Sequence, residues 1–175
     1  DDHKDWIQRH QDKIHQKKES VSDWLDSNTI HLHGTAYQVF ESDTLKPIHL
    51  PDRIHLPSGL LPRDFILSKA KRYLPERCRD IAEMMGLQFN RCRIKWMRRC
   101  WGTASLNKHI SLNAALIQVP VWISDYVMIH ECAHLVHFDH SSRFWALVAQ
   151  YEPNYKQAKL WLKQHQVALL PPAQQ

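Results

Sequence analysis

The sequence has few cysteines and no long hydrophobic run. Its four cysteines form no C-x-x-C pair and follow no disulfide-framework spacing, which argues against secreted disulfide scaffolds and against a structural zinc site made of cysteines. No apolar stretch approaches the roughly 20 residues of a membrane-spanning helix, and the first residues are too polar for a signal sequence. We therefore expect reduced thiols and a cytoplasmic protein that has no membrane partner.

The chain also begins with Asp rather than Met, from which we expect a fragment that lacks an N-terminal element. Its 175 residues are 43% hydrophobic and include seven tryptophans, enough to fill one core. We therefore expect a single domain over 1–175, with a helix and β scaffold over 1–90 and the functional core over 91–165.

The pattern of apolar residues predicts an α+β order. The expected elements are one helix or two short ones over 3–25, a hairpin or small meander over 29–57, a helix over 62–86 that Pro75 kinks or splits, paired strands over 92–99 and 109–112, a helical turn over 113–118, and helices from Ser124 or Asp125 to about His137, over 139–151 and over 154–166. Strands that precede a run of helices favour an α+β fold.

The positive charge is concentrated in one segment. The formal net charge is +5, and RCRIKWMRRC, residues 91–100, has no acid. Its five cations are Arg91, Arg93, Lys95, Arg98 and Arg99. Such a cluster attracts phosphate-bearing ligands or nucleic acid, although a solvated strand face is the simpler interpretation.

Histidines gather in the stretch VMIHECAHLVHFDHSSRFW, residues 127–145, which contains the motif H-E-x-x-H. On a helix, His130 and His134 lie one turn apart on the same face and could bind one ion at about 2.0–2.1 Å each. Glu131 would then point at a metal-bound water. The alternative is a pair of core histidines bonded to backbone carbonyls. We favour the metal site because one ion satisfies both ionisable groups on this apolar face.

An open catalytic zinc site requires a third protein ligand. His137 is excluded on a straight helix because it rises about 10.5 Å beyond His130, so we expect it at the surface or beside a ligand. His140 follows His134 by six residues, the offset in H-E-x-x-H-x-x-G-x-x-H enzymes, and is the predicted third ligand. Glu152 is the competing candidate.

These motifs resemble a known family. RRCWGTAS, HISLNAAL, DYVMIHECAH and HSSRFW, within about residues 91–162, are similar to the YgjP-like metallopeptidase-domain proteins, zincin-fold metal-dependent hydrolases related to the SprT and WLM groups. The resemblance implies a small mixed or antiparallel sheet packed on an active-site helix, followed by C-terminal helices. It implies His130, His134 and His140 as metal ligands and Glu131 as the catalytic carboxylate. The chain departs from the family at WGTAS, where members usually have WGSCS, and it lacks their additional N-terminal β-rich segment.

The leading hypothesis is a zinc-dependent hydrolase, and specifically a metallopeptidase, with one Zn²⁺ per chain, a metal-activated water and Glu131 as general base. An extended peptide would pair with the strand near WGTAS, where Trp101, Gly102 and Asn113 are the candidate substrate-binding residues. One alternative is a nucleotide or phosphoanhydride hydrolase that uses the arginines of 91–99. The other is a nucleic-acid-associated binding module that has a largely structural metal.

Two further histidines lie in the predicted β region. His31 and His33 alternate along a strand and would face the same side, where they could chelate an ion. Exposed strand histidines without a metal are the favoured interpretation.

Overall fold

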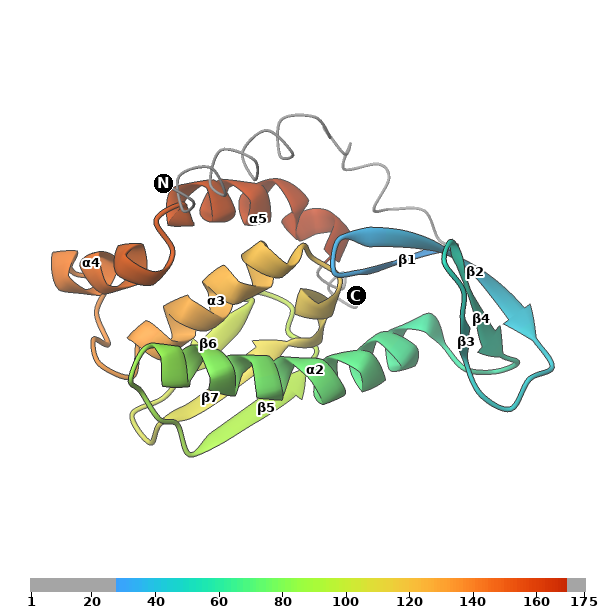
Figure 1. Ribbon diagram of the computed structural model, residues 1–175, viewed down its shortest axis with the longest axis horizontal. Coiled ribbons are helices and arrows are strands. Elements are labelled where there is room, and N and C mark those ends of the chain that lie inside the picture. Colours follow the sequence, from blue (N-terminus) through green and yellow to red (C-terminus); the bar gives the residue numbers. More distant parts are fainter. Residues whose placement is uncertain (1–27, 170–175) are drawn as a thin grey trace.

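Two small sheets and four helices form residues 28–169, which the computed structural model describes. The helix expected over 3–25 lies outside these residues. One sheet has four strands and lies beyond the N-terminal end of the long helix α2, while the other has three strands and lies beside α2 and α3 (Figure 1). The prediction of an α+β fold is confirmed.

The four-stranded sheet contains β1 (Thr29–Leu32), β2 (Thr35–Ser42), β3 (Ile48–His49) and β4 (Arg53–Pro57), in the order β1-β2-β4-β3. The expected hairpin is present, since β1 and β2 are antiparallel and join through His33 and Gly34. Both of these residues have positive φ, 53° and 83°, as a two-residue hairpin turn of type I′ requires. A meander is the wrong description of the rest, because β2 and β4 are parallel and β3 pairs on the outside of β4.

The prediction of exposed histidines in this region is half wrong. His33 is exposed in the turn, but His31 is buried, with 3% of its surface accessible. Its neighbours Ile30 and Leu32 are also buried, so β1 is covered on both faces. The alternation that suggested a solvated strand therefore does not apply to β1.

Helix α2 (Pro62–Met84) begins at the predicted proline and ends two residues before Gly86, the predicted stop. Gly86 has φ 67°, its N–H donates to the Glu83 carbonyl at 2.9 Å, and the Leu87 N–H donates to the Ala82 carbonyl at 2.8 Å. These bonds are the two that define a Schellman C-terminus.

Pro75 does not split α2, contrary to one of the two outcomes expected. A proline inside a helix removes one backbone hydrogen bond and introduces a steric clash. Buried Leu74 and Cys78 flank Pro75 and anchor both halves of the helix in the core. Tertiary packing therefore keeps the helix continuous.

The three-stranded sheet contains β5 (Arg91–Lys95), β6 (Gly102–Ala104) and β7 (His109–Asn113), in the order β5-β7-β6. The predicted pairing of the first and last of these strands is confirmed, and it is parallel. β6 runs antiparallel to β7 and is an edge strand in the described part of the chain. Ile94, Leu112 and Gly102 are aligned across the three strands, so they share the face that meets the core.

A 3₁₀ turn, η2 (Ala114–Ile117), leads into helices α3 (Val121–Ala133), α4 (Ser142–Tyr151) and α5 (Tyr155–Leu169). The predicted bounds of α3 are wrong at both ends. The helix begins directly after Pro120, whose extended ψ of 144° turns the chain into it, and it ends at Ala133, before a run of turns. Ser124 is not a cap, because its hydroxyl donates to the Val121 carbonyl at 2.8 Å inside the first turn.

Both sheets and the helices α2 to α5 contribute to one hydrophobic core. α3 crosses the middle of this core, between α2, β6 and α5. The sheet that the H-E-x-x-H helix packs against is small and mixed, as the family resemblance implied. Within residues 28–169, no helix combines the length and the apolar character that crossing a membrane requires.

Candidate metal centre

Three histidines from the end of one helix and the loop that follows it come together at the end of α3. His130 lies in the last turn of the helix, His134 directly follows it, and His140 lies in the loop before α4. One ring nitrogen from each lies within 4.8 Å of the others, and the Nε2 atoms of His130 and His140 are 3.3 Å apart. Two ligands about 2.0–2.1 Å from a tetrahedral zinc are about 3.3–3.4 Å apart. The donor set and its spacing therefore fit a metal ion.

The rings are held in a state that suits ligation. The Nδ1 of His134 lies 3.0 Å from the backbone carbonyl of His137, which can only accept, so this Nδ1 carries the proton and the Nε2 lone pair remains for a metal. Burial, followed by the neighbouring His134, His140 and Lys159, lowers the pKa of His130 to about 3. A neutral imidazole is the form that binds metals.

Helix α4 supplies an aromatic wall behind the cluster. The ring of Phe144, which is fully buried, lies 4.9 Å from that of His130, 4.5 Å from that of His134 and 4.8 Å from that of His140. Trp145 stacks on His140 at 5.7 Å. The sequence analysis gave Phe144 and Trp145 no role at the metal site. Their place in the H-S-x-x-F-W element was the signal that could have suggested one.

The start of α4 fixes where His140 lies. The Ser141 side chain accepts a hydrogen bond from the Phe144 N–H at 3.5 Å and caps the helix. The chain from His134 to Ser141 therefore turns back and brings His140 against the end of α3. His137 contributes its carbonyl to this turn and no side-chain atom to the cluster.

Glu131 is buried between α3 and β6. Only 5% of its surface is accessible, and burial raises the pKa of its carboxyl to about 8. Gly102 of β6 lies against it: a Cβ on this glycine would be 2.6 Å from both Cγ and Oε1 of Glu131. A buried carboxyl with a raised pKa, on the residue that follows His130, is suited to proton transfer at neutral pH.

The three residues predicted to bind substrate have different surroundings. Gly102 contacts Glu131, and Trp101 is half-buried, with a backbone carbonyl that accepts from the Asn113 N–H at 2.8 Å. Asn113 is fully buried. Its amide donates to the carbonyls of Met97 and Cys100, and its Oδ1 accepts from the Ala115 N–H. Neither amide hydrogen is left for a substrate, so the assignment of Asn113 is corrected to a structural one.

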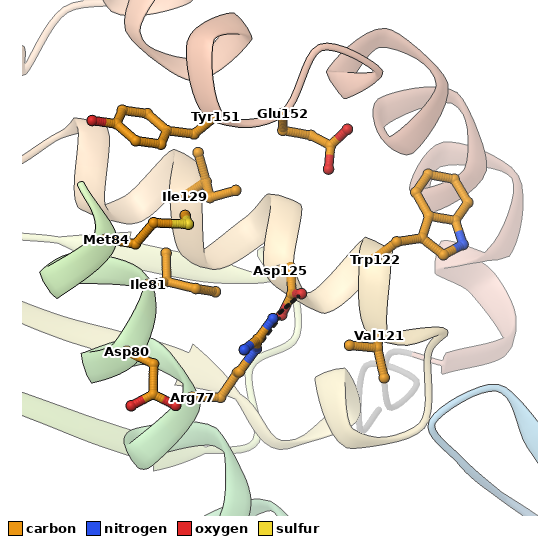
Figure 2. Close-up of a pocket in the computed structure, with 10 residues that line it drawn as sticks. All are labelled: Arg77, Asp80, Ile81, Met84, Val121, Trp122, Asp125, Ile129, Tyr151 and Glu152. Carbon is orange, nitrogen blue, oxygen red and sulfur yellow. Dashed lines mark hydrogen bonds and ion pairs between the residues drawn. The ribbon is translucent and has the colours of Figure 1, made fainter. Parts of the chain in front are cut away.

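Glu152, the competing third ligand, lies in a different place. It lines a cavity between α2, α3 and the end of α4, above the ion pair of Arg77 and Asp125 (Figure 2). One of its oxygens accepts from the Asn154 N–H at 3.0 Å. In the described part of the chain, the group of side chains spaced for a metal contains His140 and does not contain Glu152.

His31 and His33, for which chelation was the less favoured interpretation, are likewise not part of such a group. His33 lies edge-on to Tyr73, with ring centroids 4.5 Å apart, and His31 is buried in β1. Across residues 28–169, the histidine cluster of α3 is the group with metal-ligand spacing.

The cations of β5 are not part of the site. Arg91, Arg93 and Lys95 are exposed, whereas Cys92 and Ile94 between them are half-buried and face α2. Because Ile94 shares its face with Gly102, the three cations lie on the opposite face of the sheet from Glu131.

Solved structures to which this chain is similar include two metallopeptidase zymogens. Abylysin of Pyrococcus abyssi is 24% identical, with a TM-score of 0.48, over 53% of this chain and 95% of its own. Jannalysin of Methanocaldococcus jannaschii is 17% identical, with a TM-score of 0.47, over 52% of this chain and 94% of its own. Among curated proteins, none matches the sequence.

The family comparison covers nearly the whole chain. The model of the YgjP-like metallopeptidase domain matches residues 1–165. This family implies a metal cofactor, and the three-histidine cluster provides residues that could bind one. The chain therefore belongs to the YgjP-like metallopeptidase-domain family and is a metal-dependent hydrolase.

Proposed function

We propose that this protein is a zinc-dependent peptidase in which His130, His134 and His140 hold the metal and Glu131 is the general base. The observation that carries the proposal is the meeting of three histidine nitrogens within 4.8 Å, with the buried carboxyl of Glu131 on the residue that follows His130. Three neutral histidines are a ligand set that catalytic zinc uses, and they leave a coordination position open. A structural zinc site would be closed by a fourth protein ligand.

The side chains around the cluster prepare it for the metal. When bound, zinc would supply a Lewis acid that polarises a carbonyl and makes water more acidic. The His137 carbonyl fixes the tautomer of His134, and the ring of Phe144 packs against all three histidines. Together they restrict the rings to orientations in which their nitrogens converge.

Glu131 moves the proton. Its carboxylate takes a proton from the attacking water and returns it to the nitrogen of the leaving amine. Gly102 allows the backbone of β6 to approach this side chain and restrict its movement. The raised pKa of the carboxyl, about 8 by burial alone, matches a group that must both accept and release a proton near neutral pH.

The edge of β6 is the proposed substrate cleft. β6 pairs with β7 on one side, and Gly102 places the strand next to Glu131. An extended peptide added to the open side would lie close to the general base and gain backbone hydrogen bonds. We therefore infer a peptide substrate that is bound through its main chain.

The geometry favours a peptide over a phosphorylated substrate. Arginine side chains that bind phosphate must reach the reacting group. Arg91, Arg93 and Lys95 lie on the other face of the sheet, so they provide no phosphate site near Glu131.

Digestion of a mixture of unlabelled peptides, followed by mass spectrometry, tests this function. Protein loaded with zinc should produce new N-termini, and both a chelator and Glu131→Gln should abolish them. Nucleoside triphosphates are incubated in parallel. Release of phosphate or pyrophosphate without any peptide cleavage would overturn the peptidase proposal.

A further inference from the structure

The outward face of the three-stranded sheet is basic and has no acid. Residues 84–124, which include all of β5, β6 and β7, contain no Asp or Glu. They contain six cations, one more than the net charge of the entire chain, which is +5. The remaining residues therefore carry one net negative charge. The positive excess belongs to this sheet and its loops.

The strands place these charges in a regular array. Arg91, Arg93 and Lys95 alternate with half-buried residues and are exposed. Side chains two residues apart on a strand are about 6.6 Å apart and point the same way. Across the sheet, Arg91 is aligned with His109, and Arg93 is aligned with Ser111. The outward face therefore offers cations, an imidazole and hydroxyls, which are all groups that bind anions.

Within residues 28–169, no acid neutralises the three cations of β5. Arg91, Arg93 and Lys95 form no ion pair or side-chain hydrogen bond within this part of the chain, and the same is true of Arg99 and Lys108 at the two ends of the array. The face is also separate from the metal centre, since Glu131 meets the opposite side of the sheet.

The chemistry of the face identifies the partner. A protein partner would require an apolar centre to its interface, and the outward strand residues supply no large apolar side chain. A single nucleic-acid strand is usually held by aromatic rings on which bases stack, and the imidazole of His109 is the one ring among these outward strand residues. A duplex presents regularly repeating phosphates along its outside, which suit evenly spaced cations.

We propose that this outward face binds the phosphate backbone of a nucleic-acid duplex without reading its sequence. The surface is independent of the peptidase site, so its binding does not require the proposed catalytic function. It would hold the hydrolase on a polyanion while the metal centre remains open on the other side of the sheet.

Fluorescence anisotropy tests the proposal, using a labelled DNA duplex of mixed sequence at salt concentrations from about 50 to about 200 mM. The variant Arg91→Gln/Arg93→Gln/Lys95→Gln should bind more weakly, and its slope of log affinity against log salt should fall in magnitude by about 2.7, or about 0.9 for each phosphate that is no longer neutralised. Its thermal melting shows whether it is folded. Should it not fold, each single variant should lower the slope by about 0.9.

A matched control removes the same charge elsewhere. Lys71→Gln/Lys156→Gln/Lys163→Gln changes three exposed lysines of α2 and α5 and should keep the wild-type slope. Absence of duplex binding at low salt, or equal slopes for the two triple variants, would overturn the proposal. Tighter binding of single-stranded DNA than of the duplex would also overturn it. If a polyglutamate peptide competed for the face as well as duplex DNA does, the face would be assigned to an acidic protein instead. Binding that persists in Glu131→Gln would show that the face acts independently of the active site.

Discussion

Gly102 of β6 and Glu131 of α3 are in contact in a way that admits no side chain on the glycine. A Cβ at position 102 would lie 2.6 Å from Oε1 and 2.8 Å from Cδ of Glu131. Real Cβ atoms essentially never approach another heavy atom closer than 3.0 Å. The strand backbone therefore determines where the carboxyl of the proposed general base can lie.

Gly102→Ala should displace that carboxyl and impair catalysis without removing the metal. Because a positioned general base contributes about 10²–10⁴-fold to the rate, we expect a loss of kcat/KM of at least about 10²-fold. Peptide cleavage and metal content are measured together. The control is Thr103→Ala, which shortens an exposed side chain on the same strand. Full activity of Gly102→Ala would show that the position of Glu131 is not critical.

Glu131→Gln should retain the metal and lose turnover. The amide is nearly the same size as the carboxyl but cannot accept the proton of the attacking water, so kcat should fall by about 10²–10⁴-fold. KM should change little, since Glu131 is not proposed to bind the ground-state substrate. Retained turnover would refute the role assigned to this carboxylate.

Glu131 should also give the metal-free protein a distinctive pH dependence of stability. Its ordinary pKa of 4.5 rises to about 8 in the fold because of burial. Folding therefore favours the protonated form, and the stability that this form contributes is present below pH 4.5 and is lost as the pH rises to about 8. The loss amounts to at most about 5 kcal/mol.

Chemical denaturation in the presence of a chelator measures this effect. Between about pH 5 and pH 8, the free energy of unfolding of the wild type should fall relative to that of Glu131→Gln, which has no carboxyl to ionise. Other titrating groups are common to both proteins and cancel in the difference. A constant difference across this range would mean that burial does not raise the pKa of Glu131.

Asn113→Ala should destabilise the loop between β5 and β6. The buried amide donates to the Met97 carbonyl at 2.8 Å and to the Cys100 carbonyl at 3.0 Å. Removing it leaves buried carbonyls without a donor, which should cost about 3 kcal/mol of unfolding free energy. Asn107→Ala, at an exposed position of the β6–β7 turn, is the control and should change stability little. Unchanged stability of Asn113→Ala would make this residue a candidate for substrate binding again.

Local features of the site could be predicted from the sequence. The spacing of His130 and His134 places them one turn apart wherever the helix lies, and the six-residue offset directs attention to His140. Gly86 was likewise a reliable signal that α2 ends near it, because a glycine with positive φ closes a helix. Each of these inferences depends on chain geometry over a few residues.

Features that depend on tertiary contacts could not be predicted. No local pattern places Gly102 against Glu131, which follows it by 29 residues, or pairs β2 in parallel with β4. Asn113 was a candidate substrate-binding residue near WGTAS, but its amide donates to two carbonyls of the loop between β5 and β6. Pro75 was expected to kink or split a helix that core packing keeps continuous.

Metal content of the purified protein tests the central claim most directly. Elemental analysis compares the wild type with His140→Ala and with His137→Ala, which removes a side chain outside the cluster but keeps the carbonyl that orients His134. We expect about one zinc per chain in the wild type and in His137→Ala, and a large loss in His140→Ala. No metal in the wild type after zinc is supplied, or full occupancy in His140→Ala, would contradict the three-histidine centre.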